Sequence, residues 1–438
     1  MGTAVESTPG ATSSRFGNLP SKWKVEKIAD IAEVTGGSTP SRSEDAYWGG
    51  DIPWATPTDI TNLRGTTISD TKDKITEEGL NSASTHVLPK YSVLMTSRAT
   101  IGACAVNTVP MATNQGFQSL VPGDSLNTWY LFYRMQDTAP YLESLGAGST
   151  FSEVSKRVVE KVELPVPPLD EQRKIASVLA TVDAATQKTE AVIEQAKRVK
   201  RGLMQDILQH GLSEEDSKED PKSRFGKIPE SWRIMRLSDV ADVIGGSTPN
   251  TDQPEYWGGS IRWATPSDIT ALDDVTIGDT ARTITDEGLS STSTHILPEE
   301  SVLLTSRASI GNCAVNTVPM ATNQGFQSLV PGEDIDTWYL FYRISYMAPY
   351  LERLGSGSTF SEISRQTVRN LIIPVPPLEE QRVIGHRLRA FDEMIYANRE
   401  QVKELERLKR GLMQDLLAGR VRTTGKDIAV LDEVAAHG

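Results

Sequence analysis

A twenty-residue sequence, CAVNTVPMATNQGFQSLVPG, occurs twice in this chain without a single change, at Cys104–Gly123 and at Cys313–Gly332. The two copies start 209 residues apart, and the same offset relates equivalent residues over most of the chain without a gap. The chain is therefore one unit written twice, and it is long enough for two globular domains with connecting segments. Further equivalent pairs are Phe16 and Phe225, Trp48 and Trp257, Arg98 and Arg307, and Pro167 and Pro376.

The composition is that of a folded protein without a membrane span. Of the 438 residues, 38% are hydrophobic and 24% are charged, and there is no apolar run of about eighteen residues that could cross a bilayer. The first residues, MGTAVESTPGATSSR, lack the basic and apolar regions of a signal peptide. The two cysteines, Cys104 and Cys313, are repeat equivalents and are expected to be reduced core residues. We therefore expect a cytoplasmic protein.

The net charge of −13 argues against a nucleic-acid-binding protein that acts alone, because phosphate contacts favour basic surfaces. It does not exclude a DNA-reading protein whose phosphate contacts are partly supplied by partner subunits.

The central part of each repeat has the pattern of a mostly β domain. Short apolar runs rich in Val, Ile, Trp and Thr are separated by Pro and Gly, which is typical of short strands joined by turns. Aromatic residues at helical spacing predict a helix at Thr128–Gln136 and another at Thr337–Ser345. The strands of the first repeat are expected at Ile52–Ala55, Ser92–Thr96, Ala103–Asn107 and Gly116–Val121.

Each repeat ends in a proline-rich hinge, LPVPPL or IPVPPL, followed by a long helix. Proline and the residue before it disfavour helix, whereas the acidic residues after each hinge favour a helix N-terminus. Apolar residues then recur at alternating spacings of four and three, the pattern of a coiled-coil seam. The first seam is predicted at Val178, Val182, Ala185, Thr189, Val192, Ala196, Val199 and Leu203, and the second at Ile384, Leu388, Phe391, Ile395, Asn398, Val402, Leu405 and Leu412.

We expect the two long helices to pair antiparallel around a pseudo-twofold axis rather than to cover only their own domains. Thr189 lies at the midpoint of the first helix, and Asn398 is its repeat equivalent. Both are polar interruptions of an apolar seam. We therefore predict that they face each other and help to fix the register, as a buried Asn does in zippers.

These patterns define a domain organisation with boundaries at the hinges and at the charged segment between the repeats. The segments are a flexible N-terminal tail (1–17), domain 1 (18–168), long helix 1 (169–209), a linker (210–226), domain 2 (227–377), long helix 2 (378–418) and a C-terminal tail (419–438).

Catalytic motifs are missing from the sequence. There is no P-loop, no G-x-S-x-G elbow and no HExxH. His86 and His295 are the one repeat-equivalent histidine pair, and neither has a Cys or carboxylate at ligand spacing. The sequence therefore offers no familiar catalytic motif, and we expect no metal site.

Polar clusters on predicted loops are duplicated almost intact: WATPTDI and WATPSDI, TSRATIG and TSRASIG, and ATNQG twice. Arg, Asn, Gln, Ser and Thr suit the edges of DNA bases. Two alternatives remain open. Asn114 and Gln115 could cap a turn before Gly116, and Arg98 could be the partner in an internal salt bridge.

The ordered set of motifs resembles the specificity subunit of a type I restriction-modification system over residues 18–418. It comprises the GGSTP turn with Tyr47-Trp48 and Ile52-Pro-Trp54, the TSRATIG and TNQGF stretches, and PVPPLDEQRKIASVL and PVPPLEEQRVIGHRL at the start of the long helices. Any one motif is weak, but the whole set occurs twice.

The resemblance implies an α+β fold in which two target-recognition domains, mostly β with helices, are joined by two long antiparallel coiled-coil helices. Each domain of that family reads one half of a bipartite DNA target, and the helices set the spacer and dock two methyltransferase (modification) subunits. Those subunits carry S-adenosylmethionine, and restriction subunits supply ATP-driven steps, so no cofactor is expected on this chain. The resemblance thus implies a reading subunit that is not itself an enzyme. The alternatives are a symmetric protein–protein scaffold without a nucleic-acid role and a stand-alone enzyme on DNA, such as a nuclease.

The expected DNA-contacting residues are the hydroxyl, amide and guanidinium side chains of the duplicated loops. In the first repeat they are Thr56, Thr58, Ser97, Arg98, Thr100, Asn114 and Gln115, and in the second Thr265, Ser267, Ser306, Arg307, Ser309, Asn323 and Gln324. Because the two domains are nearly the same, the two half-sites are predicted to be nearly identical and inverted, giving a target close to a palindrome.

Overall fold

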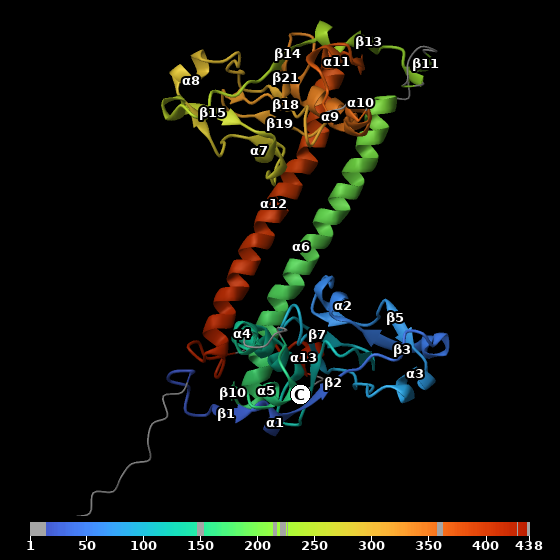
Figure 1. Cartoon of the computed structure of the whole chain (residues 1–438), viewed down its shortest axis with the longest axis vertical. Helices are drawn as coiled ribbons and strands as arrows, with labels where there is room; N and C mark the ends of the chain where they lie inside the picture. Colours follow the sequence, from blue (N-terminus) through green and yellow to red (C-terminus); the bar gives the residue numbers. More distant parts are fainter. Residues whose placement is uncertain are drawn as a thin grey trace, which may run out of the picture. The chain divides into compact units, whose positions relative to one another are not determined.

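The computed structural model describes residues 15–146, 153–212, 217–219, 225, 227–356, 362–426 and 428–435. The chain divides into two compact units. Unit 1 comprises Met1–Lys188 and Val402–Gly438, and unit 2 comprises Thr189–Gln401. Each unit therefore combines one recognition domain with parts of both long helices (Figure 1).

The first repeat is built from three small sheets and several short helices. A five-stranded sheet has the order β2-β9-β6-β7-β4, a three-stranded sheet has the order β5-β3-β8, and β1 pairs with β10. Its strands are β1 (Lys24–Lys27), β2 (Ala32–Gly36), β3 (Trp48–Ala55), β4 (Thr67–Ile68), β5 (Asp73–Ile75), β6 (Val93–Met95), β7 (Cys104–Asn107), β8 (Ala112–Thr113), β9 (Gln118–Pro122) and β10 (Glu163–Val166). Its helices are α1 (Ile28–Ile31), η1 (Asp45–Tyr47), α2 (Pro57–Thr61), α3 (Glu77–Ser82), α4 (Thr128–Gly146) and α5 (Lys156–Glu160).

The second repeat has the same sheets in the same order, β14-β21-β18-β19-β16, β17-β15-β20 and β13-β22. One difference lies in the aromatic helix, which is continuous as α4 but is divided at Met347 into α9 and α10 in the second repeat. The strands are β13 (Arg233–Arg236), β14 (Ala241–Gly245), β15 (Trp257–Ala264), β16 (Thr276–Ile277), β17 (Thr283–Ile284), β18 (Val302–Leu304), β19 (Cys313–Asn316), β20 (Ala321–Thr322), β21 (Gln327–Pro331) and β22 (Ile372–Val375). The helices are η2 (Leu237–Asp239), η3 (Pro254–Tyr256), α7 (Pro266–Thr270), α8 (Asp286–Ser290), α9 (Thr337–Tyr346), α10 (Ala348–Gly355) and α11 (Arg365–Arg369), and β11 (Ser217–Glu219) pairs with β12 (Lys227–Pro229) before the repeat.

The two long helices, α6 (Leu169–His210) and α12 (Leu378–Leu417), each follow a hinge strand. Within each unit the helices run antiparallel. In unit 2, Lys200 of α6 pairs with Asp392 of α12, and Leu208 lies in the same core cluster as Ile384. The α+β fold class expected from the sequence is therefore confirmed.

Each domain also holds the end of the helix that comes from the other repeat. In unit 1 the guanidinium of Arg134, which is 4% exposed, donates to the carbonyl oxygen of Leu417 at the end of α12. In unit 2 the guanidinium of Arg343, which is 1% exposed, donates to the carbonyl oxygen of Leu208 near the end of α6. A cation at a helix C-terminus is favoured by the helix dipole, so these buried arginines anchor the helix ends.

The helix seam differs in part from the one expected. Val192 and Val199 are 46% and 44% exposed, whereas Ile193 and Lys200, one position later in each case, face inward. Lys200 tolerates this position because its ammonium group is neutralised by Asp392 on the other helix. The predicted seam is therefore correct at Val182, Thr189 and Ala196 and wrong at Val192 and Val199, whereas Val178, Ala185 and Leu203 are half-buried.

The predicted meeting of Thr189 and Asn398 stays a prediction. Thr189 is 8% exposed, whereas Asn398 donates to the carbonyl oxygen of Met394 in its own helix.

Two equivalent Lys–Asp–Tyr groups, one in each unit, join α6 and α12 and help to hold them in register. Lys200 Nζ lies 2.5 Å from Asp392 Oδ1, and the hydroxyl of Tyr342 donates to Asp392 Oδ2 at 2.6 Å. In unit 1, Lys409 Nζ lies 2.7 Å from Asp183 Oδ1, and the Tyr133 hydroxyl donates to the same carboxylate at 2.8 Å. Opposite charges inside an apolar seam specify register because a shifted register would leave both charges unpaired.

The C-terminal segment packs against unit 1. Arg422 donates to the carboxylate of Glu171, and Asn127 donates through Nδ2 to the carbonyl oxygen of Val434 at 2.9 Å. Val434 is 1% exposed and belongs to the same hydrophobic cluster as Trp129, and it lies in the short helix α13 (Asp432–Ala435). This segment had no predicted role, and the structure shows it to be part of the domain 1 core.

Candidate nucleic-acid interface

The duplicated loops of the first repeat converge on the backbone of Ala112–Gly116. The amide of Ser38 in the GGSTP turn donates to the carbonyl oxygen of Thr113 at 3.1 Å. The amide of Asn114 donates to the carbonyl oxygen of Ala55 at 3.0 Å, and the amide of Ser97 donates to the carbonyl oxygen of Gly116 at 2.7 Å. Four motifs that are far apart in sequence thus form one cluster, which we call the four-loop cluster.

The second glycine of the GGSTP turn is required for this convergence. A Cβ atom at Gly37 would lie 2.1 Å from the carbonyl oxygen of Thr113, and one at Gly246 would lie 2.1 Å from the carbonyl oxygen of Asn323. No side chain fits at such a distance, so only glycine lets the turn approach the Thr-Asn-Gln loop.

The second repeat builds the same cluster from equivalent bonds. Ser247 donates to Thr322, Asn323 donates to Ala264, and Ser306 donates to Gly325, at backbone distances of 3.0, 3.0 and 2.7 Å. The geometry of the cluster is therefore a property of the repeated sequence.

The threonine at the start of α2 caps that helix. Asp59 accepts hydrogen bonds from the amide of Thr56 at 2.8 Å and from its hydroxyl at 2.6 Å. Thr265 and Asp268 make the same bonds in α7 at 2.7 and 2.6 Å. Thr56 and Thr265 are therefore held at the helix N-terminus, whereas Thr58 and Ser267, the second residue of each helix, are exposed.

The arginine of each TSRA loop is exposed at the tip of a strained turn. The amide of Thr100 donates to the carbonyl oxygen of Arg98 across Ala99, whose φ is +60°, and Ala308 has a φ of +59° in the second repeat. A three-residue turn with positive φ is strained for alanine. Strain repeated in both copies shows that the loop around it determines this conformation.

Both arginines also form an internal ion pair. Arg98 Nη2 lies 2.9 Å from Glu153 Oε1, and Arg307 Nη2 lies 2.9 Å from Glu362 Oε1. The internal salt bridge considered for Arg98 is therefore present. Each arginine side chain remains 46% exposed, so its other donors still face solvent. Thr100 and Ser309 lie beside these arginines. Thr100 is exposed, whereas Ser309 is half-buried and its Oγ is buried without a hydrogen-bond partner among the described residues, so Thr100 is the better placed of the two to contact DNA.

The Asn-Gln pair forms a turn and also contacts the GGSTP loop. Asn114 Oδ1 accepts a hydrogen bond from the amide of Gly116 at 2.8 Å, as the turn-capping alternative predicts. Gln115 is exposed, and its Oε1 accepts from the hydroxyl of Thr39. Asn323 and Gln324 make the equivalent bonds to Gly325 and Thr248. The Nδ2 and Nε2 donors of these amides are not used in these bonds.

The two serines of the TSRA loops were predicted to contact DNA, but their burial does not fit that role. Ser97 is 0% and Ser306 is 1% exposed. Their side-chain oxygens have no hydrogen-bond partner among the described residues, and their backbone groups hold the loop to the cluster. They are positioning residues beneath the surface, because a buried hydroxyl cannot reach a DNA base.

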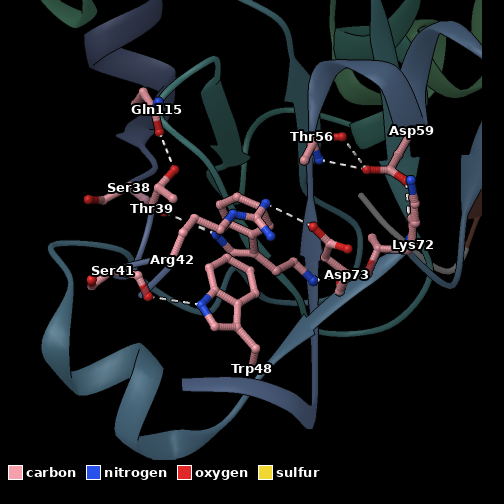
Figure 2. A network of polar contacts seen from close by, with 12 residues as sticks. Ser38, Thr39, Ser41, Arg42, Trp48, Thr56, Asp59, Lys72, Asp73 and Gln115 are labelled. Carbon is pink, nitrogen blue, oxygen red and sulfur yellow. Dashed lines mark hydrogen bonds and ion pairs between the residues drawn. The ribbon is translucent and has the colours of Figure 1, made fainter. Parts of the chain in front are cut away.

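Sequence reasoning missed a tryptophan pair beside the cluster (Figure 2). The rings of Trp48 and Trp54 meet edge to face with centroids 5.1 Å apart. Arg42 Cζ lies 3.8 Å from the Trp48 ring centroid, and Arg42 Nη2 lies 2.9 Å from Asp73 Oδ2. The indole Nε1 of Trp54 donates to the carbonyl oxygen of Ser38 at 3.0 Å, which ties the pair to the GGSTP loop. We call these indoles the tryptophan platform.

The described residues contain no group of three or more His, Cys, Asp or Glu side chains that could hold a metal ion. Burial raises the pKa of the Cys104 thiol above its ordinary range and raises the pKa of Cys313 to about 11. A thiol in either environment is a poor nucleophile at neutral pH. No helix in the described part of the chain is long and apolar enough to cross a membrane.

Comparison with known proteins places both repeats in one family. Residues 20–198 and 229–407 each match the type I restriction modification DNA specificity domain. The two matches cover the four-loop cluster and the first part of the long helix in each repeat.

Curated relatives are similar over nearly the whole chain. The type I restriction enzyme MjaIX specificity subunit of Methanocaldococcus jannaschii is 29% identical over 93% of this chain and 95% of its own length. The type I restriction enzyme MjaVIII specificity subunit of the same organism is 24% identical over 92% of this chain and 94% of its own length. The crystal structure of the S subunit of a type I restriction-modification system from M. genitalium superposes with a TM-score of 0.60 at 12% identity, over 92% of this chain and 98% of that one.

Proposed function

This chain belongs to the type I restriction-modification specificity family, and we propose on that premise that it is the subunit that reads the DNA target of such a complex. The observation that supports this most directly is the four-loop cluster, which gathers hydroxyl, amide and guanidinium groups at one place in each repeat. Side chains of these types form hydrogen bonds with base edges and phosphates.

Each repeat reads one half of a bipartite target, and the two half-sites are nearly identical. Arg98 and Arg307, and Asn114 and Asn323, are equivalent residues in matching conformations. Among the predicted contacts the only changes between the repeats are Thr58 to Ser267 and Thr100 to Ser309, which keep the hydroxyl group. Like surfaces bind like sequences, so the target is close to a palindrome around its spacer. Thr56, Gln115, Thr265 and Gln324 complete the contact set.

Binding requires each TSRA arginine to use donors that its internal ion pair leaves available. Glu153 engages Nη2 of Arg98, while nearly half of the side chain is exposed. The glutamate holds the guanidinium in one orientation, which lowers the entropy lost when a base or phosphate is bound.

The long helices set the spacer and dock two modification subunits. Apolar side chains are exposed on both helices, at 46% for Val192, 40% for Tyr396 and 38% for Met394. Apolar side chains left exposed on a helix are candidates for a protein contact. Two modification subunits would bind S-adenosylmethionine and methylate the DNA, and restriction subunits would use ATP and Mg²⁺. This chain would be non-catalytic and would hold no cofactor.

Such an assembly accounts for the acidic character of the chain. With a net charge of −13, the protein would repel DNA at long range, so basic surfaces of the partner subunits would supply many of the phosphate contacts. The complex acts in the cytoplasm, where both DNA and its partner subunits are present.

The proposal is tested with the chain co-purified with the modification subunits from its own system. The complex is incubated with a random pool of DNA duplexes, and bound sequences are amplified and read. We expect enrichment of one bipartite sequence with a fixed spacer. A complex that assembles but enriches no sequence would refute the reading function and favour a protein–protein scaffold.

A further inference from the structure

A guanidinium lies over the tryptophan platform in both repeats (Trp48 and Trp54, or Trp257 and Trp263) but comes from different places in the chain. It comes from the turn before η1 in repeat 1 and from the residue before β17 in repeat 2. In repeat 1 this group belongs to Arg42, and its repeat equivalent is Thr251. In repeat 2 the group belongs to Arg282, which is the equivalent of Asp73. Arg282 Cζ lies 3.6 Å from the Trp257 ring centroid, close to the 3.8 Å between Arg42 and Trp48. Both repeats therefore have a guanidinium over the platform, although the two arginines occupy positions that are not repeat equivalents.

The exchange changes the charge of the platform. In repeat 1, Asp73 neutralises Arg42 through a 2.9 Å contact with Nη2. In repeat 2 the position equivalent to Asp73 is occupied by Arg282 itself, so no aspartate is present there to neutralise it. The guanidinium of Arg282 is exposed and has no ion-pair or hydrogen-bond partner in the described part of the chain. The nearby Asp279 is instead 3.4 Å from Arg262. The platform of repeat 2 therefore presents an unneutralised cation.

We propose that Arg282 binds an acceptor pair on DNA, a guanine edge or a backbone phosphate, and that Arg42 contributes less to such a contact because Asp73 neutralises its charge. A stacked guanidinium is held flat by the indole, and its N–H groups at the free edge form a fork that matches either acceptor. This inference rests on the proposed DNA-reading function.

The tryptophan platform of repeat 2 adjoins the four-loop cluster of the same repeat. The indole Nε1 of Trp263 donates to the carbonyl oxygen of Ser247 at 3.0 Å, and the indole Nε1 of Trp257 donates to the carbonyl oxygen of Asn250 at 3.2 Å. Ser247 belongs to the same GGSTP turn as Thr248, which contacts Gln324 of the four-loop cluster. A duplex bound at the cluster would thus lie beside the platform.

The consequence is an asymmetry between two otherwise similar half-sites. The half-site of repeat 2 gains a contact with an unneutralised guanidinium, whereas the matching guanidinium of repeat 1 is neutralised by Asp73. If the acceptor is a phosphate, the dependence of binding on salt includes one extra released counterion. If it is guanine, the target departs from a palindrome at one position.

The test exchanges the two platforms in the complex with modification subunits. T251R/R282D gives repeat 2 the paired charges of repeat 1, and R42T/D73R gives repeat 1 the free cation of repeat 2. Dissociation constants for the target duplex and an unrelated duplex are measured across salt concentrations. We expect T251R/R282D to weaken target binding roughly 5- to 150-fold, the range of one bidentate contact, and R42T/D73R to strengthen it or leave it unchanged. Arg282→Lys keeps the charge but loses the fork, so it should also weaken binding.

The outcomes separate this inference from the function on which it rests. A loss confined to the target duplex assigns Arg282 to a base, and a loss on both duplexes with a smaller salt slope assigns it to a phosphate. Unchanged binding by both T251R/R282D and Arg282→Lys, in variants that melt at the wild-type temperature, overturns the inference. A wild-type complex that does not distinguish the two duplexes contradicts the proposed function instead.

Discussion

Replacing Lys200 by methionine would remove one charge from a buried pair that holds the two long helices in register. The Lys200 side chain is 19% exposed and that of Asp392 is 11% exposed, and Nζ lies 2.5 and 2.6 Å from the two carboxylate oxygens. Breaking a buried pair by removing one partner costs about 3–5 kcal/mol. Tyr342 still donates to Asp392 at 2.6 Å, and a cavity of about 560 Å³ beside the pair can admit water. These effects lower the expected loss to about 2–4 kcal/mol.

Native-state hydrogen exchange measures this loss where it occurs. In the full chain we expect amides of α6 and α12 within unit 2 to exchange roughly 30- to 700-fold faster in the variant, the factor that corresponds to 2–4 kcal/mol. Lys197→Met is the matched control in the same unit and on the same helix, because the Lys197–Glu194 pair is 40% and 48% exposed. Exposed pairs of this kind contribute less than about 1 kcal/mol.

A double variant tests the reason for the loss. In K200M/D392N no buried charge is left unpaired, and the carboxamide oxygen can still accept from Tyr342. We expect the double variant to exchange more slowly than Lys200→Met alone. Equal exchange in the two variants, or an equal effect of Lys197→Met, would refute the argument that an unpaired buried carboxylate causes the loss.

Three further predictions follow from individual contacts. Arg422→Ala should lower the free energy of unfolding of unit 1 by about 1–3 kcal/mol, because it leaves the carboxylate of Glu171, 2% exposed, without the donors now at 2.7 and 2.9 Å; an unchanged urea denaturation curve would contradict this. Arg98→Ala should weaken target binding by the assembled complex by about 1–3 kcal/mol if the contact is bidentate, and an equal loss on unrelated DNA would exclude a base contact. Because burial raises the pKa of Cys313 to about 11, its alkylation in the folded chain should be slow at pH 8 and accelerate as the pH approaches 11; alkylation at pH 8 as fast as a free thiol would show that the site is open.

The outline of the fold could be predicted from the sequence because it follows from local signals. The exact repeat required two copies of one domain, and the proline hinges located the starts of α6 and α12 at Leu169 and Leu378. The helix seam was harder, because hydrophobicity favours Val192 and Val199 over Lys200. The lysine is inside only because Asp392 comes from the other helix. A partner that lies 192 residues away in sequence leaves no local signal.

The candidate site was predicted in composition but not in arrangement. The residue types of the loops identified the cluster, but burial separates members that look alike: Ser97 is fully buried, whereas Arg98, the next residue, is exposed. The tryptophan platform was missed because Arg42 has no counterpart at Thr251. Two pairs of equivalent positions, Arg42 with Thr251 and Asp73 with Arg282, have to be compared together. Each repeat then has one arginine in the pair, which is the signal that a positive charge is retained.

The central claim is that two nearly identical domains read two nearly identical half-sites. It is tested most directly by sequencing methylated adenines across the genome of a strain that carries the complete complex, alongside the same strain without this chain. We expect methylation, lost in the deletion strain, at one bipartite motif whose two halves are inverted copies with at most a few differing positions. Two unrelated half-sites, or methylation that persists without this chain, would contradict the account.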